Sequence, residues 1–412
     1  MHTNQLIVFL IVITVYFLIE IYVFGVVRAL LAESSDGVRR SAWIIYWGIS
    51  LIALIGVLFY TKLDPVVFRE LRLFILTLFF VNLMAKLAAS LLVAGDDFRR
   101  LVTFLYGYFS PATPQTMPGR SAFMAKAAMA AGAVPLAVFS FGILTGAYDY
   151  RVRRKSITFP NLPRAFDGIR VVQISDIHTG SFFNKTAVQG GIDLINGEKP
   201  DLVLFTGDLV NDESAEAKPY LDIFKKIKSP MGVFSTMGNH DYGDYRSWSS
   251  AAARQQDIRD LQAMHRYMGW DILLNEHRIL RVEGEEIGLL GVENWGAGRF
   301  SKYGDLAKTY QGTDDLPFKM LMSHDPSHWD AQIRPEFGSI DLTLAGHTHG
   351  MQLGIEIGDF RWSPSQYMYK QWADLYQEGS QYLYVNRGYG FIGYPGRIGI
   401  LPEITVLELR RA

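Results

Sequence analysis

The sequence contains no cysteine, which excludes disulfide bonds, thiolate metal ligands and a cysteine nucleophile. It also has almost no excess charge, because 40 Lys and Arg are balanced by 41 Asp and Glu, which gives a formal net charge of -1. Nucleic-acid-binding proteins normally present a basic surface, so we expect no nucleic-acid partner. Histidine is scarce too, with nine residues in 412. The positions of these few histidines are therefore informative.

Apolar residues are plentiful, at 49% of the chain, and the long apolar runs all lie within residues 1–150. Each run is near the roughly 20 residues that cross a bilayer. The runs predict a four-helix transmembrane region with spans at residues 6–31, 42–60, 71–94 and 122–147. The first run is too long for the core of a signal peptide, and no Lys or Arg precedes Arg28. We therefore expect this run to remain as a membrane span.

The ionisable residues Glu20, Lys86 and Lys126 interrupt the predicted spans. An ionisable group at membrane depth is a candidate functional site. The structural alternative is that Lys126 snorkels near a span end and that pairing between helices satisfies Glu20 and Lys86. We favour the structural interpretation.

A basic cluster, RVRRK at residues 151–155, follows the last span directly. It is the densest group of Lys and Arg beside any predicted span, and cytoplasmic flanks of spans are enriched in these residues. The cluster predicts a multi-pass membrane protein whose C-terminal domain lies in the cytoplasm. We interpret residues 151–160 as a basic linker.

Residues 161–412 have the texture of a globular α/β domain, with short apolar runs separated by Gly, Asp, Asn and Pro. The apolar spacing of Val188, Ile192 and Ile195 predicts a helix within residues 184–200. Eight runs predict strands, at residues 169–174, 202–206, 232–236, 287–292, 319–323, 341–345, 382–385 and 404–409.

Metal-competent side chains follow five of these predicted strands. Open α/β sheets place their sites at the carboxyl ends of strands. Polar groups are rarely concentrated at buried strand ends unless they are paired or bind a metal. The pattern therefore predicts one metal site built from Asp176, His178, Asp208, Asn239, His324, His347 and His349.

His347 and His349 lie two residues apart in the stretch GHTHG. In an extended backbone, residues two apart point to the same side, so both rings can face one ion. Taken alone, this motif also fits a surface loop with two solvated histidines. The other four strand ends decide in favour of a metal.

The ligand types narrow the choice of metal. Imidazole and carboxylate without thiolate suit Mn, Fe or Zn, whereas Ca or Mg prefers an all-oxygen shell. Seven ligands are too many for one tetrahedral ion and suit two divalent metal ions that share a carboxylate. Such pairs stabilise both the attacking and the leaving oxygen of an in-line displacement at phosphorus.

These motifs resemble the pattern D-x-H, G-D, G-N-H-[DE], H and G-H-x-H of the calcineurin-like metallophosphoesterases. The resemblance covers about residues 157–412 and fills every liganding position. It implies a four-layer αββα sandwich of two mixed sheets. The stretches TGDLVND, LMSHDP and GHTHG and the tail NRGYGFIGYPGRIGILPEI resemble the branch of membrane-tethered bacterial phosphoesterases that includes UDP-2,3-diacylglucosamine pyrophosphatases. This resemblance implies a location in the bacterial inner membrane. Met351 departs from that branch, which commonly has a second glycine at this position before Gln352. The motifs that carry the resemblance are D176-I-H178, G207-D208, G238-N239-H240-D241, H324 and G346-H-T-H349.

The resemblance also implies individual roles. Asp176, His178 and His349 would hold the first ion. Asn239, His324 and His347 would hold the second, with Asp208 bridging the two. The nucleophile would be a metal-bound hydroxide. The implied assignment of the metal ligands is thus complete without a protein nucleophile.

His240 would be the catalytic histidine, acting on the phosphoryl oxygens or the leaving group. Asp241 would orient its ring and fix its tautomer. The residues themselves support this reading, because a histidine beside a metal ligand can act as a general acid near neutral pH. A purely supporting role for His240 behind the ligands is the alternative.

The remaining candidates are weaker. We expect none of His265, His277 and His328 to be a ligand, and we expect His265 to be partly exposed on a helix. His328 lies four residues after His324 and fits a place behind the ligands. Arg387 is a candidate phosphate contact, because guanidinium matches phosphate oxygens; a structural ion pair is the alternative. The aromatic segment 360–372 fits either a lip at the membrane interface or an ordinary packed loop.

Three functions fit the sequence. The first is a hydrolase of a lipid-linked phosphodiester or pyrophosphate, with membrane lipids as partners. The second is a phosphodiesterase for a soluble nucleotide that uses the spans only as an anchor. The third is a non-catalytic membrane binding protein, and the complete ligand set argues against it.

Overall fold

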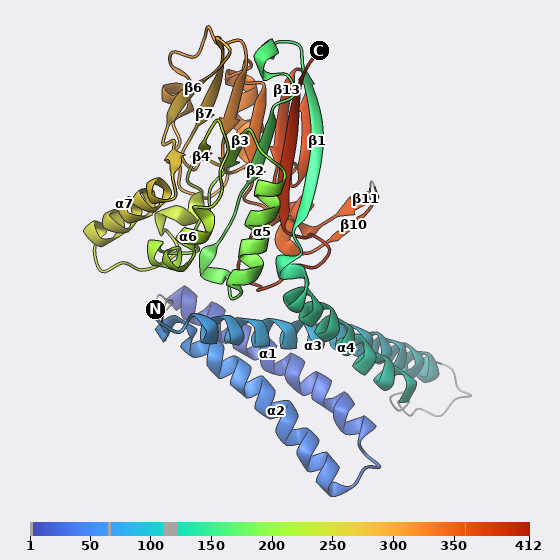
Figure 1. Ribbon diagram of the computed structural model, residues 1–412. Helices are drawn as coiled ribbons and strands as arrows, with labels where there is room; N and C mark the ends of the chain where they lie inside the picture. The colour runs from blue at the N-terminus through green and yellow to red at the C-terminus, as the bar shows by residue number, and fades with distance from the viewer. Residues whose placement is uncertain (1–2, 65–66, 110–121, 359) are drawn as a thin grey trace. The chain divides into compact units, whose positions relative to one another are not determined.

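The computed structural model describes residues 3–64, 67–109, 122–358 and 360–412 (Figure 1). The chain forms two compact units, Met1–Phe141 and Gly142–Ala412. Each unit has its own secondary structure. The first is helical, and the second contains all of the strands in the described residues.

Four long helices form the first unit, as the sequence predicts. All four are long and apolar enough to cross a membrane. α3 extends well past the predicted span at residues 71–94. The helices are α1 (Thr3–Leu30), α2 (Asp36–Phe59), α3 (Arg69–Phe109) and α4 (Ala122–Leu144).

The ionisable residues of the predicted spans are accounted for within this unit. The ammonium of Lys86 on α3 bonds to the Glu20 carboxylate on α1 and to the Ser50 hydroxyl on α2. Glu20 and Lys86 are both buried, and Lys126 on α4 is exposed. Since each buried charge has its partner on a neighbouring helix, the contacts support the structural interpretation of this pair.

Two mixed six-stranded sheets organise the second unit. The first sheet has the order β1 (Arg151–Phe159), β14 (Glu403–Arg411), β2 (Arg170–Ile174), β3 (Leu202–Phe205), β4 (Val233–Ser235) and β5 (Trp270–Ile272). The second has the order β12 (Asp374–Glu378), β13 (Gln381–Val385), β9 (Leu342–Ala345), β8 (Lys319–Met322), β7 (Glu285–Gly291) and β6 (Glu276–Val282). A separate hairpin pairs β10 (Ile355–Ile357) with β11 (Phe360–Trp362).

Alternation along the strands builds the layers. In β3, Leu202 and Leu204 face the second sheet, whereas Val203 and Phe205 face helices on the outer side. This is the period-two pattern of a strand buried on both faces. The outer helices of the first sheet are α5 (Lys185–Gly197), α6 (Leu221–Phe224) and α7 (Ala251–Tyr267). Short helical segments cover the second sheet, namely α8 (Leu306–Tyr310), η8 (Trp329–Ile333) and α9 (Arg334–Glu336).

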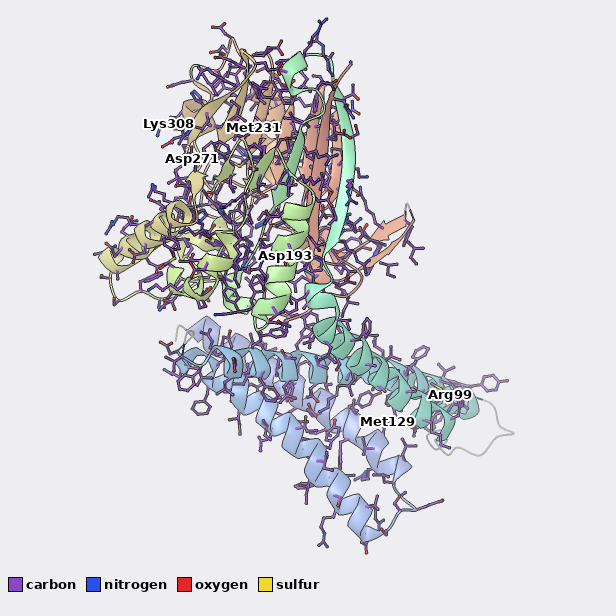
Figure 2. The ribbon with its side chains drawn as sticks, in the orientation of Figure 1. Arg99, Met129, Asp193, Met231, Asp271 and Lys308 are labelled. Carbon is purple, nitrogen blue, oxygen red and sulfur yellow. The ribbon has the colours of Figure 1, made fainter. Side chains whose placement is uncertain are left out.

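The predicted four-layer αββα sandwich is therefore confirmed. Charged side chains such as Asp193 on α5 and Lys308 on α8 are exposed on the outside of these layers (Figure 2). All eight predicted strands are present, and so is the helix predicted within residues 184–200. The strands that the sequence did not predict are β1, β5, β6, β10, β11 and β12.

The interpretation of residues 151–160 as a linker is wrong. Residues Arg151–Phe159 form β1, which pairs in parallel with β14 along its whole length. Ile157 and Phe159 point into the space between the sheets. The basic residues that suggested a linker lie on an edge strand, where exposed charge is normal, and Arg154 pairs with Glu198.

Candidate metal centre

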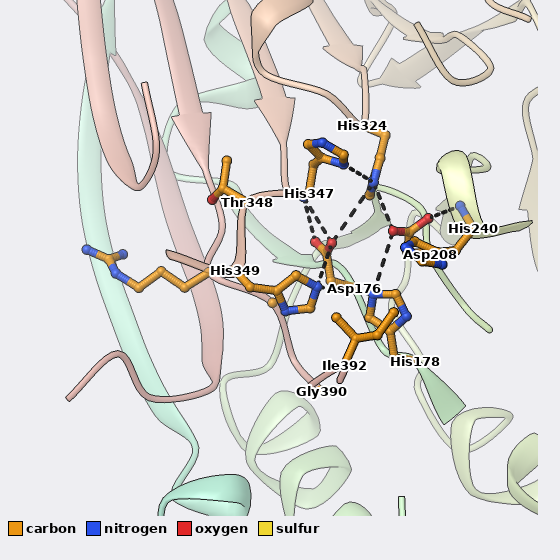
Figure 3. A network of polar contacts seen from close by, with 12 residues as sticks. Asp176, His178, Asp208, His240, His324, His347, Thr348, His349, Gly390 and Ile392 are labelled. Carbon is orange, nitrogen blue, oxygen red and sulfur yellow. Dashed lines mark hydrogen bonds and ion pairs between the residues drawn. The ribbon is translucent and has the colours of Figure 1, made fainter. Parts of the chain in front are cut away.

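One end of the sandwich carries all seven predicted ligands, because strands of both sheets end there. β2 leads into Asp176 and His178, and β3 leads into Asp208. β4 precedes Asn239, β8 precedes His324, and β9 precedes His347 and His349. Figure 3 shows that the two aspartates and four histidines among them converge. They fall into two groups.

The first group consists of Asp176, His178 and His349, whose candidate ligand atoms all lie within 4.8 Å of one another. The Nε2 atom of His349 lies 3.2 Å from Asp176 Oδ1 and 3.1 Å from His178 Nε2. All three residues are buried. Two imidazole nitrogens and a carboxylate oxygen thus face one small space.

The second group consists of Asp208, His324 and His347, under the same 4.8 Å limit. The Nδ1 atom of His347 lies 3.3 Å from His324 Nε2. It also lies 2.8 Å from the Oδ1 atom of Asn239, which brings the predicted amide ligand to the same place. Every predicted ligand therefore belongs to one of the two groups or touches it.

Asp208 lies between the groups. Its Oδ2 atom is 3.1 Å from His324 Nε2 in the second group and 3.6 Å from His178 Nε2 in the first. A single carboxylate oxygen is therefore within reach of nitrogens from both groups, as a bridging ligand requires.

The backbone at this site is strained. Non-glycine residues seldom adopt positive φ, and such residues cluster at functional sites. Five of the seven predicted ligands do so: Asp176 (51°), His178 (50°), Asp208 (62°), His347 (70°) and His349 (51°). The fold holds each of these turns in a conformation that places the side chain, at some cost in stability. Met351, which stands where the resembling branch commonly has glycine, also has a positive φ of 50°, and its side chain is exposed.

Two glycines of the motifs allow the loops to meet. A Cβ atom on Gly346 would lie 2.0 Å from Ser175 Oγ and 2.2 Å from Asp176 Oδ2. A Cβ atom on Gly238 would lie 2.3 Å from Asp208 Oδ1. Both positions require glycine because a carboxylate of the site occupies the space that a side chain would need.

The electrostatics suit a cation. Burial raises the pKa of Asp176, but its interactions with His349, including a hydrogen bond, and with His324 outweigh burial and hold this pKa below its usual value. Burial keeps the pKa of His178 and His349 below the ordinary value of histidine, so these rings are neutral and their lone pairs are available. For His324, burial lowers the pKa, but the Asp208 carboxylate outweighs it and raises the pKa to about 10.

These states fit the donor set of a divalent metal centre. Two buried carboxylates and several neutral imidazoles converge in the two groups. Among the described residues of these groups, protonated His324 carries the positive charge that a metal ion would otherwise supply. Deprotonated carboxylate and neutral imidazole are the forms in which these side chains bind transition metals. The residues present therefore fit two divalent ions.

His240 lies beside the first group, with its ring centre 5.0 Å from that of His178. Its Nδ1 atom lies 2.7 Å from the carbonyl oxygen of Asn211. This contact requires Nδ1 to carry the proton and to donate it to the carbonyl. The Nε2 atom is then the basic nitrogen of the ring.

The predicted contact between Asp241 and the His240 ring is wrong. The Asp241 carboxylate accepts hydrogen bonds from the backbone N–H groups of Asp208, Leu209 and Gly238. It therefore holds two of the loops that carry ligands together, and the Asn211 carbonyl sets the tautomer of His240. The sequence could not predict the contact between His240 and Asn211, because every residue has a backbone carbonyl and residue type does not show which one accepts the hydrogen bond.

The prediction of a phosphate contact for Arg387 is also wrong, and its alternative, a structural ion pair, is what the structure contains. The side chain is fully buried. Its guanidinium lies 2.6 Å from a Glu403 oxygen and 2.7 Å from a Glu356 oxygen. The Arg387 guanidinium is therefore paired with two carboxylates within the fold.

Arg397, which the sequence did not single out, lies closer to the site. Its Nη2 atom is 3.1 Å from His349 Nδ1 and donates to the carbonyl oxygens of Arg387 (2.7 Å) and Gly390 (2.6 Å). The buried guanidinium thus holds the loop after β13 against a predicted ligand. The signal in the sequence that could have indicated this role is the presence of an arginine in the glycine-rich tail.

Two tyrosines that the sequence also missed support the second group. The Tyr369 hydroxyl lies 2.7 Å from His347 Nε2, on the opposite side of the ring from Nδ1. The Asn239 amide nitrogen donates to the Tyr245 hydroxyl at 2.8 Å. Each contact orients a predicted ligand so that its other polar atom, Nδ1 of His347 or Oδ1 of Asn239, faces the group.

A cavity of about 780 Å³ lies next to His347. Three of its lining residues contact or approach that ring: Phe300 at 4.7 Å between ring centres, Tyr369, and Asp325, whose Oδ2 is 3.8 Å from Nε2. The cavity therefore adjoins the second group. Its lining residues are Ala297, Gly298, Arg299, Phe300, Asp325, Ser327, Asp330, Ala331, Met368, Tyr369, Lys370 and Gln371.

The other three histidines within the described residues have partners outside the two groups. His265 is fully buried, with Nδ1 2.9 Å from Ser235 Oγ, so the expected partial exposure is wrong. It lies on the side of α7 that packs against the first sheet. His328 Nδ1 lies 2.8 Å from Ser323 Oγ, and His277 Nδ1 lies 3.0 Å from the Thr309 carbonyl. None of the three joins either metal group within the described part of the chain.

Comparison with known proteins gives the family. The calcineurin-like phosphoesterase family matches residues 169–351, and a family described as the probable transmembrane domain of calcineurin-like phosphoesterases matches residues 4–147. The uncharacterized metallophosphoesterase YkuE of Bacillus subtilis is 30% identical over 253 residues, covering 60% of this chain and 82% of that protein. The transmembrane protein with metallophosphoesterase domain of Danio rerio is 29% identical over 283 residues, covering 66% of this chain and 60% of that protein.

Among solved structures, a sulfate thiohydrolase from Thermus thermophilus aligns over 60% of this chain and 57% of its own, at 12% identity and a TM-score of 0.36. The relatives named here are transmembrane or uncharacterized metallophosphoesterases and not UDP-2,3-diacylglucosamine pyrophosphatases, so the finer resemblance is not supported by them. The chain belongs to the calcineurin-like metallophosphoesterases, with an N-terminal transmembrane region.

Proposed function

We propose that this protein is a membrane-anchored phosphoesterase that uses two divalent metal ions to hydrolyse a phosphodiester or pyrophosphate bond. The position of Asp208 carries the proposal. One of its oxygens is within 3.6 Å of nitrogens from both buried groups. A bridged pair of ions is the arrangement that stabilises both oxygens of an in-line displacement at phosphorus.

We assign each ion the group that its ligands form. Asp176, His178 and His349 hold the first ion, and Asn239, His324 and His347 hold the second, with Asp208 shared. When bound, the ions lower the pKa of water and place positive charge beside the phosphoryl oxygens. Mn, Fe and Zn match these ligands best.

His240 has the geometry of a proton donor to the leaving group. Its Nδ1–H is committed to the Asn211 carbonyl, so the proton that it exchanges with substrate is on Nε2. Asp241 acts on the loops through their N–H groups and does not touch the ring. It is a positioning residue in this assignment.

The substrate that we propose is lipid-linked. The cavity beside His347 offers room for a leaving group, and Phe300 and Met368 supply apolar surface within it. The four apolar helices on the same chain keep the phosphoesterase unit at a bilayer, where a lipid-linked substrate is concentrated.

The test uses the full chain in detergent with an aryl phosphodiester. We expect hydrolysis that a chelator abolishes and that Mn, Fe or Zn restores. Absence of hydrolysis with every metal would leave a non-catalytic binding protein as the better reading. A panel of lipid-linked and nucleotide substrates then decides between the lipid substrate and a soluble nucleotide.

We also propose that the phosphoesterase unit faces the cytoplasm, because the basic residues 151–155 directly follow the last predicted span. The cysteine-free chain makes the test simple. A single cysteine at the exposed residue Arg281 should react with a membrane-impermeant maleimide only after cells are opened. Labelling of intact cells would reverse the orientation.

A further inference from the structure

The β10–β11 hairpin has two unlike faces. Residues paired across antiparallel strands point to the same side of the ribbon. Ile355 pairs with Trp362, and Ile357 pairs with Phe360, so these four apolar side chains share one face. The intervening pair, Glu356 and Arg361, shares the other face. The hairpin is therefore amphipathic at strand spacing.

Its polar face is fixed to the phosphoesterase unit. Glu356 pairs with the buried Arg387 at 2.7 Å and also with Arg153 on β1. Arg361 lies 3.2 Å from Asp374 on β12. These ion pairs set which side of the hairpin meets the rest of the unit. The apolar face is consequently the one turned outward.

That outward face is exposed. Ile355 is 47%, Ile357 73% and Phe360 61% exposed. The apolar surface continues into the following turn, because the Trp362 indole nitrogen contacts the Tyr367 hydroxyl at 3.4 Å. Tyr367 is 76% exposed. Single exposed apolar residues are ordinary, but a contiguous group marks an interaction site.

The small size of this apolar face and the membrane spans of the same chain indicate what covers it. Two strands of three residues are far too small to provide the roughly 800 Å² per partner of a stable protein interface. A bilayer imposes no such minimum, because the chain's own spans already hold it there. α4 ends at Leu144 and β1 begins at Arg151, so at most about 25 Å of chain separates them.

Residue types at the patch also suit a bilayer. Tryptophan and tyrosine favour the interfacial zone of a membrane, which matches Trp362 and Tyr367. Lys370, which is exposed nearby in sequence, is of the type that interacts with lipid headgroups. Segment 360–372 is therefore divided: Phe360, Tyr367 and Met368 are exposed, whereas Ser363, Ser365, Gln371 and Trp372 are buried in the unit.

We propose that the apolar face of the β10–β11 hairpin, continued by Tyr367 and Met368, is a lipid-contacting surface that enters the interface of the bilayer spanned by the same chain. The proposal does not depend on catalysis. Met368 also lines the cavity beside His347, so this surface reaches the edge of the candidate active site. A lipid-linked substrate would have a continuous apolar path between the bilayer and the cavity.

The experiment places single cysteines in the cysteine-free full chain, at Ile357→Cys and, as a second position on the same face, at Phe360→Cys. Arg281→Cys on β6 is the matched exposed control. Each variant carries an environment-sensitive fluorophore and is reconstituted into vesicles of phosphatidylcholine and phosphatidylglycerol. Phosphatidylcholine brominated on its acyl chains serves as the quencher.

We expect the brominated lipid to quench the labels at 357 and 360 strongly and the label at 281 little, with the reverse order for aqueous iodide. Equal quenching at all three positions would overturn the proposal. Disulfide cross-linking between copies through Cys at 357 or 360, without lipid quenching, would also overturn it and assign the face to a second copy of the chain.

Discussion

The Oδ2 atom of Asp208 lies 3.1 Å from the Nε2 atom of His324, and both side chains are buried. The carboxylate outweighs the effect of burial on the ring and raises the pKa of His324 to about 10. In the metal-free protein the histidine proton therefore neutralises charge that a bound ion would neutralise. Metal and proton compete for the same nitrogen.

This competition predicts the pH dependence of metal binding. Because the folded pKa of His324 exceeds the ordinary value, the stability from its proton is fully present below about 6.5 and is lost as pH rises through about 10. Metal binding must displace that proton, so Mn affinity should increase with pH over this window, with release of protons. Calorimetry in buffers of different ionisation enthalpy measures the release. Affinity that is flat over the window would contradict the assignment of His324 as a ligand.

Asp208→Asn should remove the bridge between the ions. We expect loss of bound metal and a fall in turnover of about 10²-fold or more, since even residues behind ligands contribute 10–100-fold. The fold should persist, because Asn can still accept the hydrogen bond from the His240 N–H. Elemental analysis and aryl phosphodiester hydrolysis measure both effects. Asp193→Asn, at an exposed acid on α5, is the control, and wild-type metal content in Asp208→Asn would refute the bridge.

His240→Ala should behave differently. Metal content should stay near that of the wild type, because the ring lies beside the groups and is not within them. Turnover should fall by roughly 10²–10⁴-fold, the usual contribution of a general acid. Substrates with good leaving groups should lose least, since they need no proton. Equal losses for good and poor leaving groups would assign the ring to charge stabilisation, and His277→Ala controls for loss of a histidine elsewhere.

Glu216→Gln should stabilise the protein at high pH. Burial raises the pKa of Glu216 to about 8, and its carboxyl accepts a hydrogen bond from the Asn211 N–H. Its protonated form favours folding, so this contribution is present below about 4.5 and lost as pH rises through about 8. The neutral glutamine avoids that loss and should gain about 1–3 kcal/mol above pH 8. Thermal unfolding at pH 5 and pH 9 tests it; an equal effect at both would exclude the titration.

Arg387→Lys should lower stability without changing substrate binding. Lysine keeps the charge but cannot bond to Glu403 and Glu356 with the same fork. Breaking a buried pair costs about 3–5 kcal/mol, and the retained charge should reduce this to about half. KM for the aryl phosphodiester should be unchanged at temperatures where the variant is folded. A large increase in KM with an unchanged melting temperature would restore the phosphate contact that the structure argues against.

The sequence correctly predicted that these side chains converge, because their signal is local. Each ligand follows a buried strand within a few residues, as Asp176 follows β2 and His324 follows β8, so the topology that brings strand ends together assembles the site. The apolar runs of β2 and β8 are visible without any knowledge of partners. Residue type and position relative to the strands were sufficient to predict which side chains converge.

The remaining features depend on contacts between distant segments. Tyr369 and Arg397 lie in irregular stretches, and their importance comes only from the rings that they meet. The basic side chains of β1 concealed the alternation of Ile157 and Phe159, because an edge strand tolerates charge that a central strand does not. Asp241 was assigned to the nearest histidine in sequence, although its oxygens face backbone groups from two loops.

The position of β14 between β1 and β2 has a consequence for biosynthesis. β14 is the last strand along the chain, yet it pairs in parallel with β1 on one side and antiparallel with β2 on the other. During translation the ribosome therefore releases β1 and β2 with their facing edges unpaired, and unpaired edges invite association with other chains. The loop with Asp176 and His178 follows β2 directly. A nascent chain can thus place its four apolar helices long before it can assemble a metal centre, and folding of the phosphoesterase unit should complete only after synthesis of Glu403–Arg411.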